Sequence, residues 1–405
     1  MTKTRGEQML ELRRARMEAT APFLRGGFRP FFFGGALWAI LALAIWLLAL
    51  IGFVTIPSNF GALAWHRHEM LFGFAGAVIT GFLLTAIPNW TGRLPIAGPP
   101  LAALFALWVL GRVSVLFSAL APPAAATVID AGFYLLVAMI AGREVLQAGN
   151  NRNLPLVAMV LLLGVANLLD HLSAGGALPD SEIGWKVALA IITLMISVVG
   201  GRIVPSFTRN WLAKQGVSKG LPTQPNRFDT AVLIVAALAL LAWITAPAGR
   251  PTGLLFALAG GLQFVRLGRW KGWKTLRDPL VFILHLGYAW IPVGLGLFAA
   301  VSFGSSVPQS AAVHALTAGA MSTMILAVMT RATLGHTGRD LVAGPLTWLC
   351  YILVTIGALL RVTSSLGWVA FGSSMEIAGL FWIGAFTIFL FGYAPMLLSP
   401  RIEGR

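Results

Sequence analysis

The chain has 405 residues, of which 58% are hydrophobic and only 11% are charged, and its formal net charge is +15. Soluble globular domains carry about 25% charged residues, so this composition excludes a soluble protein and predicts an all-α polytopic membrane protein. The basic residues lie at the ends of apolar runs, where membrane proteins keep them, so the positive charge does not indicate a nucleic-acid partner.

Apolar runs long enough to cross a hydrocarbon core of about 30 Å recur along the whole chain. They predict twelve membrane-spanning helices, at residues 31–53, 65–88, 98–120, 124–146, 154–174, 182–206, 228–247, 251–268, 279–303, 309–331, 342–362 and 375–398. Clusters of Pro and Gly, such as AGPP and GLPTQP, mark turns between them. We expect a basic segment at residues 1–28, a single transmembrane domain at residues 29–401, and a leftover protease-recognition sequence, IEGR, at residues 402–405.

The distribution of Lys and Arg predicts the orientation of the chain. Basic residues gather in the N-terminal segment and in the loops after the sixth and eighth spans, whereas the alternate loops are nearly bare. Cytoplasmic loops carry this excess, so both termini are expected in the cytoplasm. The only cysteine, Cys350, lies inside an apolar run, which excludes a disulfide framework. Without a CxxCH motif, any haem would be non-covalent.

The stretch WHRHEM at the start of the second span is unusually polar for a chain of this composition. All the histidines of the chain lie in or beside predicted spans: His66, His68, His171, His285, His314 and His336. Ionisable groups at membrane depth are costly and mark functional sites, and imidazole is the commonest nitrogen ligand for metals. An interfacial, structural role is the alternative for each of them.

Helix geometry limits which of these histidines can cooperate. Residues two apart on a helix point about 200° from one another, so His66 and His68 are not expected to bind one ion. We expect His68 to face the interior, and His66 and Glu69 to share another face near the periplasmic water boundary. There they would form part of a second metal site, or a proton path toward it in which Glu69 relays protons. The alternative is that His66 only caps the span.

The remaining histidines are expected to serve other centres. His171 and His285 are assigned to a second centre apart from His68, and Asp170 is a carboxylate available to orient an imidazole on another span. His336 forms a cytoplasmic-side site, alone or with His285, or is structural. Arg67, Arg112 and Arg361 lie against the charge bias of the chain. They bind haem propionates, or they form ion pairs with Asp130, Glu69 or Glu376.

Spans two and ten contain an internal repeat. HEMLFGFAGAVITGFLLTAIPNWTGR begins at His68 and HALTAGAMSTMILAVMTRATLGHTGR begins at His314. Both segments start with His and end with Thr-Gly-Arg over the same length. A weaker likeness at the end of span six suggests three four-helix units.

These segments, together with FRPFFFGGALWA and LHLGYAWIPVGL, resemble the NnrS family over nearly the whole chain. The resemblance implies a bacterial inner-membrane protein of nitric oxide metabolism and denitrification that contains haem and copper. We therefore expect haem b between His68 and His314, copper as a second metal, and an electron donor such as a quinol or a periplasmic cytochrome.

The leading hypothesis is a protein that reduces nitric oxide, or binds it and limits nitrosative damage. By analogy, haem-copper oxidases and nitric oxide reductases also have twelve spans in three arcs. The three-histidine copper site of those enzymes is absent here, because spans six and seven contain no histidine. A transporter or metal exporter, and a non-catalytic sensor or assembly factor, are the competing hypotheses.

Overall fold

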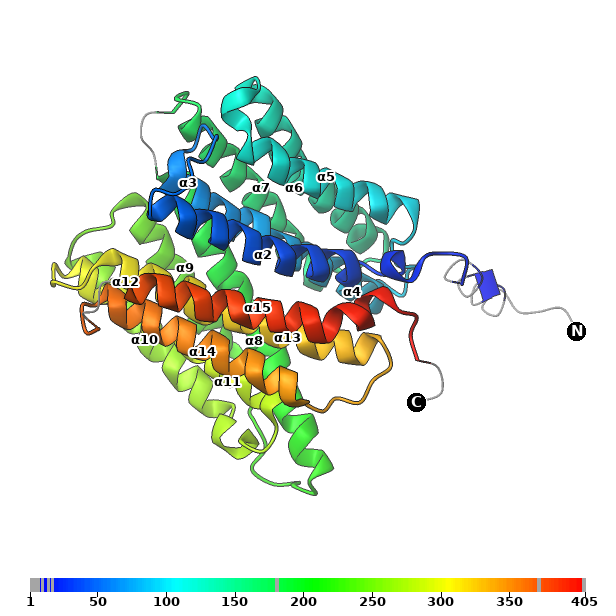
Figure 1. Ribbon diagram of the computed structural model, residues 1–405. Coiled ribbons are helices and arrows are strands. Elements are labelled where there is room, and N and C mark those ends of the chain that lie inside the picture. The colour runs from blue at the N-terminus through cyan, green and yellow to red at the C-terminus, as the bar shows by residue number, and fades with distance from the viewer. Residues whose placement is uncertain are drawn as a thin grey trace, which may run out of the picture. The chain divides into compact units, whose positions relative to one another are not determined.

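The computed structural model describes Gln8, Glu11, Leu12, Ala15 and residues 18–178, 182–369 and 373–402. Most of the expected basic N-terminal segment and residues 403–405 of the expected protease-recognition sequence lie outside these residues. Within the described residues every regular element is a helix, as Figure 1 shows. This confirms the all-α fold that the composition predicts.

The described helices follow the apolar runs of the sequence. They are α2 (Phe28–Leu50), α3 (Gly61–His68), α4 (Gly76–Thr91), α5 (Pro99–Leu116), α6 (Pro123–Gln147), α7 (Leu154–Ala174), α8 (Ile183–Lys214), α9 (Arg227–Thr245), α10 (Arg250–Arg269), α11 (Pro279–Ser302), α12 (Gln309–His314), α13 (Ser322–His336), α14 (Pro345–Ser365) and α15 (Ser374–Leu398). Short π-helical segments join α3 to α4 and α12 to α13, so each pair forms one continuous span.

Every predicted span corresponds to a helix in the described residues. Eleven of these helices are long and apolar enough to cross a membrane. The remaining one, α10, matches the predicted eighth span in position. Its apolar surface is interrupted by the buried Gln263 and Arg266, which lowers its hydropathy. The chain is therefore a multi-pass membrane protein.

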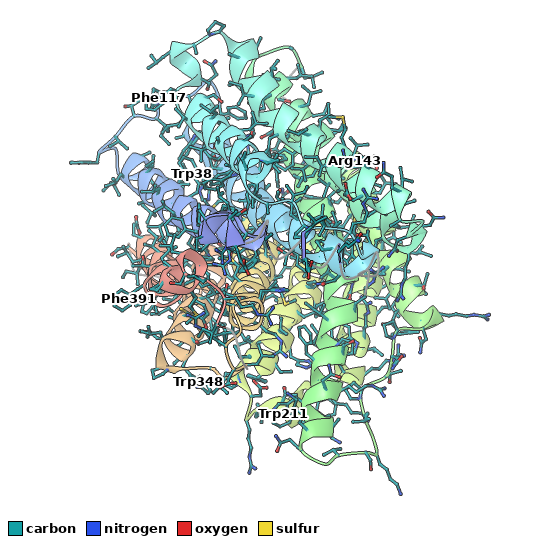
Figure 2. All side chains as sticks on the ribbon, turned by 90° about the vertical axis from the view of Figure 1, so that its right-hand side faces the viewer. Trp38, Phe117, Arg143, Trp211, Trp348 and Phe391 are labelled. Carbon is teal, nitrogen blue, oxygen red and sulfur yellow. The ribbon has the colours of Figure 1, made fainter. Side chains whose placement is uncertain are left out.

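Many large apolar side chains point away from the helices toward the surroundings. Phe391 has an exposed fraction of 76%, and Trp348 and Phe117 are also exposed. Figure 2 shows these three side chains on the outside of the helices. Such residues would be costly in water, but they match the hydrocarbon of a bilayer.

The chain divides into two compact units. Unit 1 comprises residues 1–184, 332–340 and 393–405, and unit 2 comprises residues 185–331 and 341–392. Unit 1 contains α2 to α7, in which α5 packs on α6 and α6 packs on α7. In unit 2, α10 packs between α9 and α11.

Both π-helical segments begin directly after a histidine. Glu69–Ala75 follows His68, and Ala315–Met321 follows His314. A π-helical turn changes the regular hydrogen-bond pattern, and the surroundings must satisfy the displaced backbone groups. In unit 1 the Trp108 indole donates to the carbonyl of Gly73 at 3.1 Å and the Tyr134 hydroxyl donates to that of Phe72. In unit 1 the span formed by α3 and α4 is therefore held in an irregular shape by neighbouring side chains.

Unit 2 is held together by a buried polar cluster around Arg266 of α10. Its Nε donates to Asp229 of α9 at 2.8 Å, and its Nη1 donates to the Tyr288 hydroxyl of α11 at 2.9 Å and to the Ser197 carbonyl of α8 at 3.0 Å. The Tyr288 hydroxyl in turn donates to Gln263 Oε1 at 2.6 Å. The guanidinium of α10 therefore connects four helices, because α8, α9 and α11 each supply an acceptor for it.

Gly201 of α8 makes room for this guanidinium. A Cβ atom added there would lie 2.7 Å from Cζ of Arg266, whereas one added at Gly261 of α10 would have no neighbour within 4 Å. We expect Gly201→Ala to lower the unfolding temperature in detergent, because overpacking a core costs about 1–3 kcal/mol. Gly261→Ala is the matched control and should leave the unfolding temperature unchanged or slightly higher. Equal unfolding temperatures for the two variants would contradict this packing role.

Candidate metal centre

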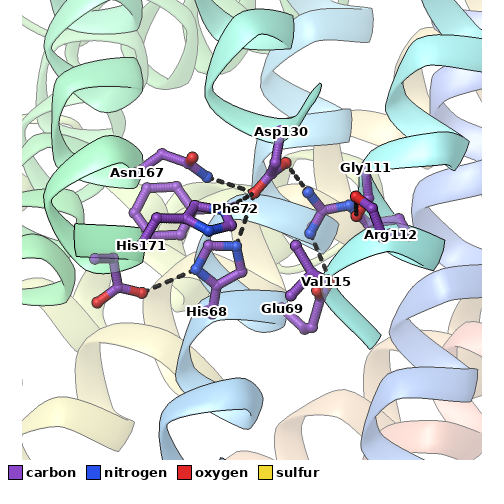
Figure 3. Close-up of polar contacts among 12 residues, drawn as sticks. His68, Glu69, Phe72, Gly111, Arg112, Val115, Asp130, Asn167 and His171 are labelled. Atoms are coloured by element: carbon purple, nitrogen blue, oxygen red, sulfur yellow. Dashed lines mark hydrogen bonds and ion pairs between the residues drawn. The ribbon is translucent and has the colours of Figure 1, made fainter. Parts of the chain in front are cut away.

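A buried polar cluster in unit 1 gathers side chains from four spans. His68 ends α3, Glu69 begins the π-helical segment, Arg112 comes from α5, and Asp130 comes from α6. The fourth of these spans, α7, adds Asn167, Asp170 and His171. Figure 3 shows most of these side chains converging on the carboxylate of Asp130.

Asp130 is the centre of the cluster and is 1% exposed. Its Oδ2 accepts from Asn167 Nδ2 at 2.8 Å, and it lies 2.8 Å from His68 Nε2 and 3.2 Å from His171 Nε2. Its Oδ1 accepts from Arg112 Nη2. A carboxylate away from water is stable only when it is paired and hydrogen-bonded. These four partners therefore explain how an acidic residue can lie inside an apolar helix.

His68 contacts a carboxylate with each of its ring nitrogens. Nδ1 lies 2.9 Å from Asp170 Oδ2, on the side of the ring opposite Asp130. The rings of Phe60 and Phe72 lie 4.5 Å and 4.8 Å from the imidazole, measured between centroids. This arrangement fixes the ring, because neither nitrogen can turn without losing a charge-assisted hydrogen bond.

Arg112 joins this histidine cluster to a second carboxylate. Its Nη1 donates to Glu69 Oε2 at 2.6 Å, and the Trp38 indole of α2 donates to the same oxygen at 2.6 Å. Glu69 is fully buried. The guanidinium therefore bridges two acidic residues from neighbouring spans and fixes their orientation.

The charges of the cluster do not balance within the protein. Three carboxylates, those of Glu69, Asp130 and Asp170, lie around one guanidinium and two imidazoles. Both ring nitrogens of His68 lie at hydrogen-bond distance from an ionised carboxylate, so this ring carries two protons and a positive charge. With a neutral His171, the cluster has an excess of one negative charge. Uncompensated charge in an apolar interior is costly, so the cluster favours binding of a divalent cation.

The donor atoms fit such an ion. One atom each from His68, Asp130 and His171 lies within 4.8 Å of the others, and all three residues are buried. Two imidazoles and one carboxylate are the ligand set of many non-haem iron(II) sites, which keep further coordination positions open. Asp170 accepts from the outer nitrogen of His68, which is the usual support for a metal-binding histidine.

Buried polar atoms without hydrogen-bond partners lie beside these donors and also favour a bound ligand. Among the described residues, Glu69 Oε1, Arg112 Nε and Asn167 Oδ1 are buried and have no hydrogen-bond partner. Buried polar atoms nearly always have a partner, and exceptions indicate strain, an ion or a bound molecule. The surroundings of the three donors therefore fit a site that takes a polar ligand.

The structure corrects two expectations about this region. His171 was assigned to a centre apart from His68, but the two rings lie 5.1 Å apart and share Asp130, because α7 packs against α3. Glu69 was expected at a water boundary beside His66. It is instead fully buried, because Arg112 and Trp38 draw its carboxylate into the cluster.

Other expectations about this helix end are confirmed. The rings of His66 and His68 lie in different surroundings, as helix geometry predicts, since the His66 ring stacks on Trp46 of α2 at 4.8 Å between centroids. Asp170 does orient an imidazole on another span, which is His68. Nothing in unit 1 alone tests the expected haem between His68 and His314, and that pairing stays a prediction.

The remaining histidines lie elsewhere. His285 on α11 is buried, and its Nε2 lies 2.8 Å from the Thr208 hydroxyl of α8. The Nδ1 atom of His314 donates to the Ser310 carbonyl at 2.7 Å. The exposed ring of His336 lies 5.4 Å from Phe28. Since His285 and His336 belong to different units, their expected pairing also stays a prediction.

The three arginines differ in their partners. Arg112 forms the ion pairs with Glu69 and Asp130 that were one of its two expected roles. Arg67 pairs with Glu182 at 3.0 Å near the surface. Arg361 donates to the Ser365 hydroxyl. A role for any of them in binding propionates stays a prediction.

Reasoning from the sequence missed the central residue of the cluster. Asp130 was considered only as an ion-pair partner, and Asn167 and Trp38 were not considered. The signal was present, since Asp130 is an acidic residue inside an apolar span and such residues mark functional sites. Asn167 is uncharged and Trp38 is one of 14 tryptophans, so only their contacts distinguish them.

Arg112 provides a test of the charge balance. We expect Arg112→Met to destabilise the protein by about 3–5 kcal/mol, because it leaves two buried carboxylates without a cation. Adding Glu69→Gln should recover part of this loss, since the amide removes one charge and keeps an acceptor for Trp38. Unfolding in detergent measures both effects.

Arg143→Met is the control, because this arginine is 67% exposed and its partner Glu144 keeps a second ion pair with Arg93. Exposed pairs contribute at most about 1 kcal/mol. A double variant that is less stable than Arg112→Met alone would contradict the charge account.

Comparison with known proteins identifies the family to which the chain belongs. No curated protein matches it. The family model described as NnrS protein matches residues 22–401, which includes α2 to α15. The chain therefore belongs to the NnrS family.

Proposed function

We propose that the protein binds a non-haem iron(II) ion at His68, Asp130 and His171 and handles nitric oxide there. The observation that carries this proposal is the buried set of two imidazoles and one carboxylate, with its excess of negative charge. The link to nitric oxide rests on what is known of the NnrS family in general. When bound, such an ion supplies open coordination positions that a small neutral molecule can occupy.

The residues of the cluster have separate roles in this proposal. His68 and His171 supply nitrogen donors, and Asp130 supplies an oxygen donor. Asp170 holds Nδ1–H of His68, so that Nε2 presents its lone pair to the site. Asn167 and Arg112 fix the Asp130 carboxylate from two sides. Phe60 and Phe72 exclude water around His68, which favours an apolar ligand over a charged one.

A haem at His68 would need the Nε2 atom that lies 2.8 Å from Asp130 in this cluster. The proposal assigns this atom to the non-haem ion, and the haem expected between His68 and His314 stays a prediction. Copper is less favoured than iron here because one donor is a carboxylate, a ligand that suits harder ions.

Glu69 is the proposed proton carrier of the site. Its Oε2 is held by Arg112 and Trp38, whereas Oε1 has no partner among the described residues. Reduction of nitric oxide consumes protons, and a positioned carboxylate can deliver them from one oxygen. Electrons would come from a quinol or a periplasmic cytochrome. In this proposal the protein lies in the bacterial inner membrane with both termini in the cytoplasm.

Metal analysis of purified protein tests the site directly. We expect His68→Ala, His171→Ala and Asp130→Ala to lose iron, because each removes one of three donors. Glu144→Gln, which removes a carboxylate from the same helix as Asp130 but outside the cluster, should retain it. Copper in place of iron would correct the metal but keep the site. Unchanged metal content in all three variants would reject the site.

Glu69→Gln separates binding from turnover. The amide keeps the shape of the side chain, so iron should be retained, while consumption of nitric oxide with a reductant should fall by about 10²-fold or more. Nitric oxide electrodes and metal analysis on the same sample give both quantities. Wild-type consumption in this variant would exclude Glu69 as the proton carrier.

A further inference from the structure

The segment that joins α10 to α11 combines cations with exposed apolar side chains. Its sequence is WKGWKTLRD, in which the cations are Lys271, Lys274 and Arg277. Trp273 has an exposed fraction of 61%, and Leu276 has one of 59%. Lys274 and Arg277 are exposed as well. Apolar and positively charged side chains therefore alternate on the outer surface of this short segment.

The backbone of the segment is held in one shape. The Thr275 hydroxyl donates to the Gly272 carbonyl at 2.7 Å, and the Lys274 amide donates to the Lys271 carbonyl at 3.0 Å. Gly272 packs on the buried ring of His285, because a Cβ atom added there would lie 2.6 Å from Cγ of that ring. Of the described residues other than glycine, Lys271 alone has a positive φ, at 57°. Strained backbone of this kind clusters at functional sites.

Two ammonium groups of the segment lie beside the same glycine. The Nζ atom of Lys271 donates to the carbonyl of Gly220, in the loop after α8, at 2.7 Å. A Cβ atom added at Gly220 would lie 3.6 Å from Nζ of Lys271 and 3.8 Å from Nζ of Lys274. The two positive charges therefore lie close together and repel each other. An anion in contact with both would remove this repulsion.

No carboxylate of the described residues forms an ion pair with either lysine. Asp229, at the start of α9, pairs with Arg266 at 2.8 Å and with Arg269 at 3.6 Å. Asp278, at the end of the segment, accepts from the amide of Leu280 at 3.0 Å and so caps α11. The acidic residues at the ends of the two loops thus have other partners. The positive charge beside Gly220 is therefore left for an anion from outside the chain.

The neighbouring surface indicates the class of this anion. The last two turns of α10 expose Phe264 to 70% and Val265 to 52%. Such side chains match the hydrocarbon of a bilayer, so the segment that follows α10 lies where the membrane surface begins. Exposed tryptophan, here Trp273, is typical of the headgroup region. A molecule bound at the two ammonium groups would have hydrocarbon beside it, which fits a phospholipid.

We propose that Lys271 and Lys274 bind the phosphate of an acidic phospholipid, while Trp273 and Leu276 enter the surrounding bilayer surface. Ammonium groups are common ligands of phosphate. An acidic lipid is favoured over a zwitterionic one, because a headgroup with its own cation would add a third positive charge beside the two lysines. All these residues belong to unit 2, so the lipid site is independent of the proposed metal centre in unit 1.

Native mass spectrometry of the purified chain in a non-ionic detergent tests this site. The protein is titrated with phosphatidylglycerol, which is acidic, and with phosphatidylcholine, which is zwitterionic. We expect the wild type to bind phosphatidylglycerol more tightly. Lys274→Gln should weaken this binding about fivefold, and the double variant Lys271→Gln, Lys274→Gln about 25-fold, because each change removes one cation beside the anionic headgroup.

Arg227→Gln is the matched control. It removes one positive charge from an exposed position at the start of α9, outside the pair of lysines, and should leave the affinity for phosphatidylglycerol unchanged. The side chain of Lys274 makes no hydrogen bond to a described residue, so Lys274→Gln should fold normally. This single variant decides the test if the double variant fails to elute as folded protein from a sizing column.

Three outcomes would overturn the proposal. Equal affinity of the wild type for the two lipids would exclude a site for acidic headgroups. An equal loss of affinity in Lys274→Gln and Arg227→Gln would show a diffuse attraction between the basic surface and acidic lipid. Displacement of phosphatidylglycerol by an equal concentration of inorganic phosphate would show that the lysines bind free phosphate and that the acyl chains contribute nothing.

Discussion

The carboxylate of Asp130 imposes the strongest constraint on unit 1. A single negative charge inside an apolar helix requires compensation, and four side chains from three other spans supply it. Each of these spans must reach the correct depth for its donor to lie within hydrogen-bond distance. The polar cluster therefore forms only when α3, α5, α6 and α7 pack together. Their packing in turn depends on the cluster, because a buried carboxylate without its partners would be unstable.

The charge of Asp130 also explains why the same cluster holds the helices together and can bind a ligand. Arg112 balances part of the negative charge, but two imidazoles beside three carboxylates leave an excess that a cation can neutralise. A fully compensated cluster, such as that of Arg266 in unit 2, connects helices and leaves little capacity for a ligand. The difference between the two clusters lies in their charge balance and in the presence of imidazoles.

Irregular helix geometry recurs where this chemistry occurs. A π-helical turn begins immediately after both His68 and His314, and in each copy a glycine within the turn brings a tryptophan against the backbone. Such turns are rare and often lie at functional sites, because they redirect side chains that a regular helix would point elsewhere. In unit 1 both Glu69 and His68 reach the same cluster, although side chains of adjacent residues on a helix point in different directions.

The sequence by itself determined the membrane fold, its spans and the histidine-started repeat, because hydropathy and residue spacing are local properties. It also determined that His66 and His68 serve different surroundings, since helix geometry alone separates them. Tertiary structure decided the rest. Asp130 and His171 join His68 only because α6 and α7 pack beside α3. The burial of Glu69 depends on partners from α2 and α5. Such contacts between spans distant in the chain are set by packing, which no local pattern records.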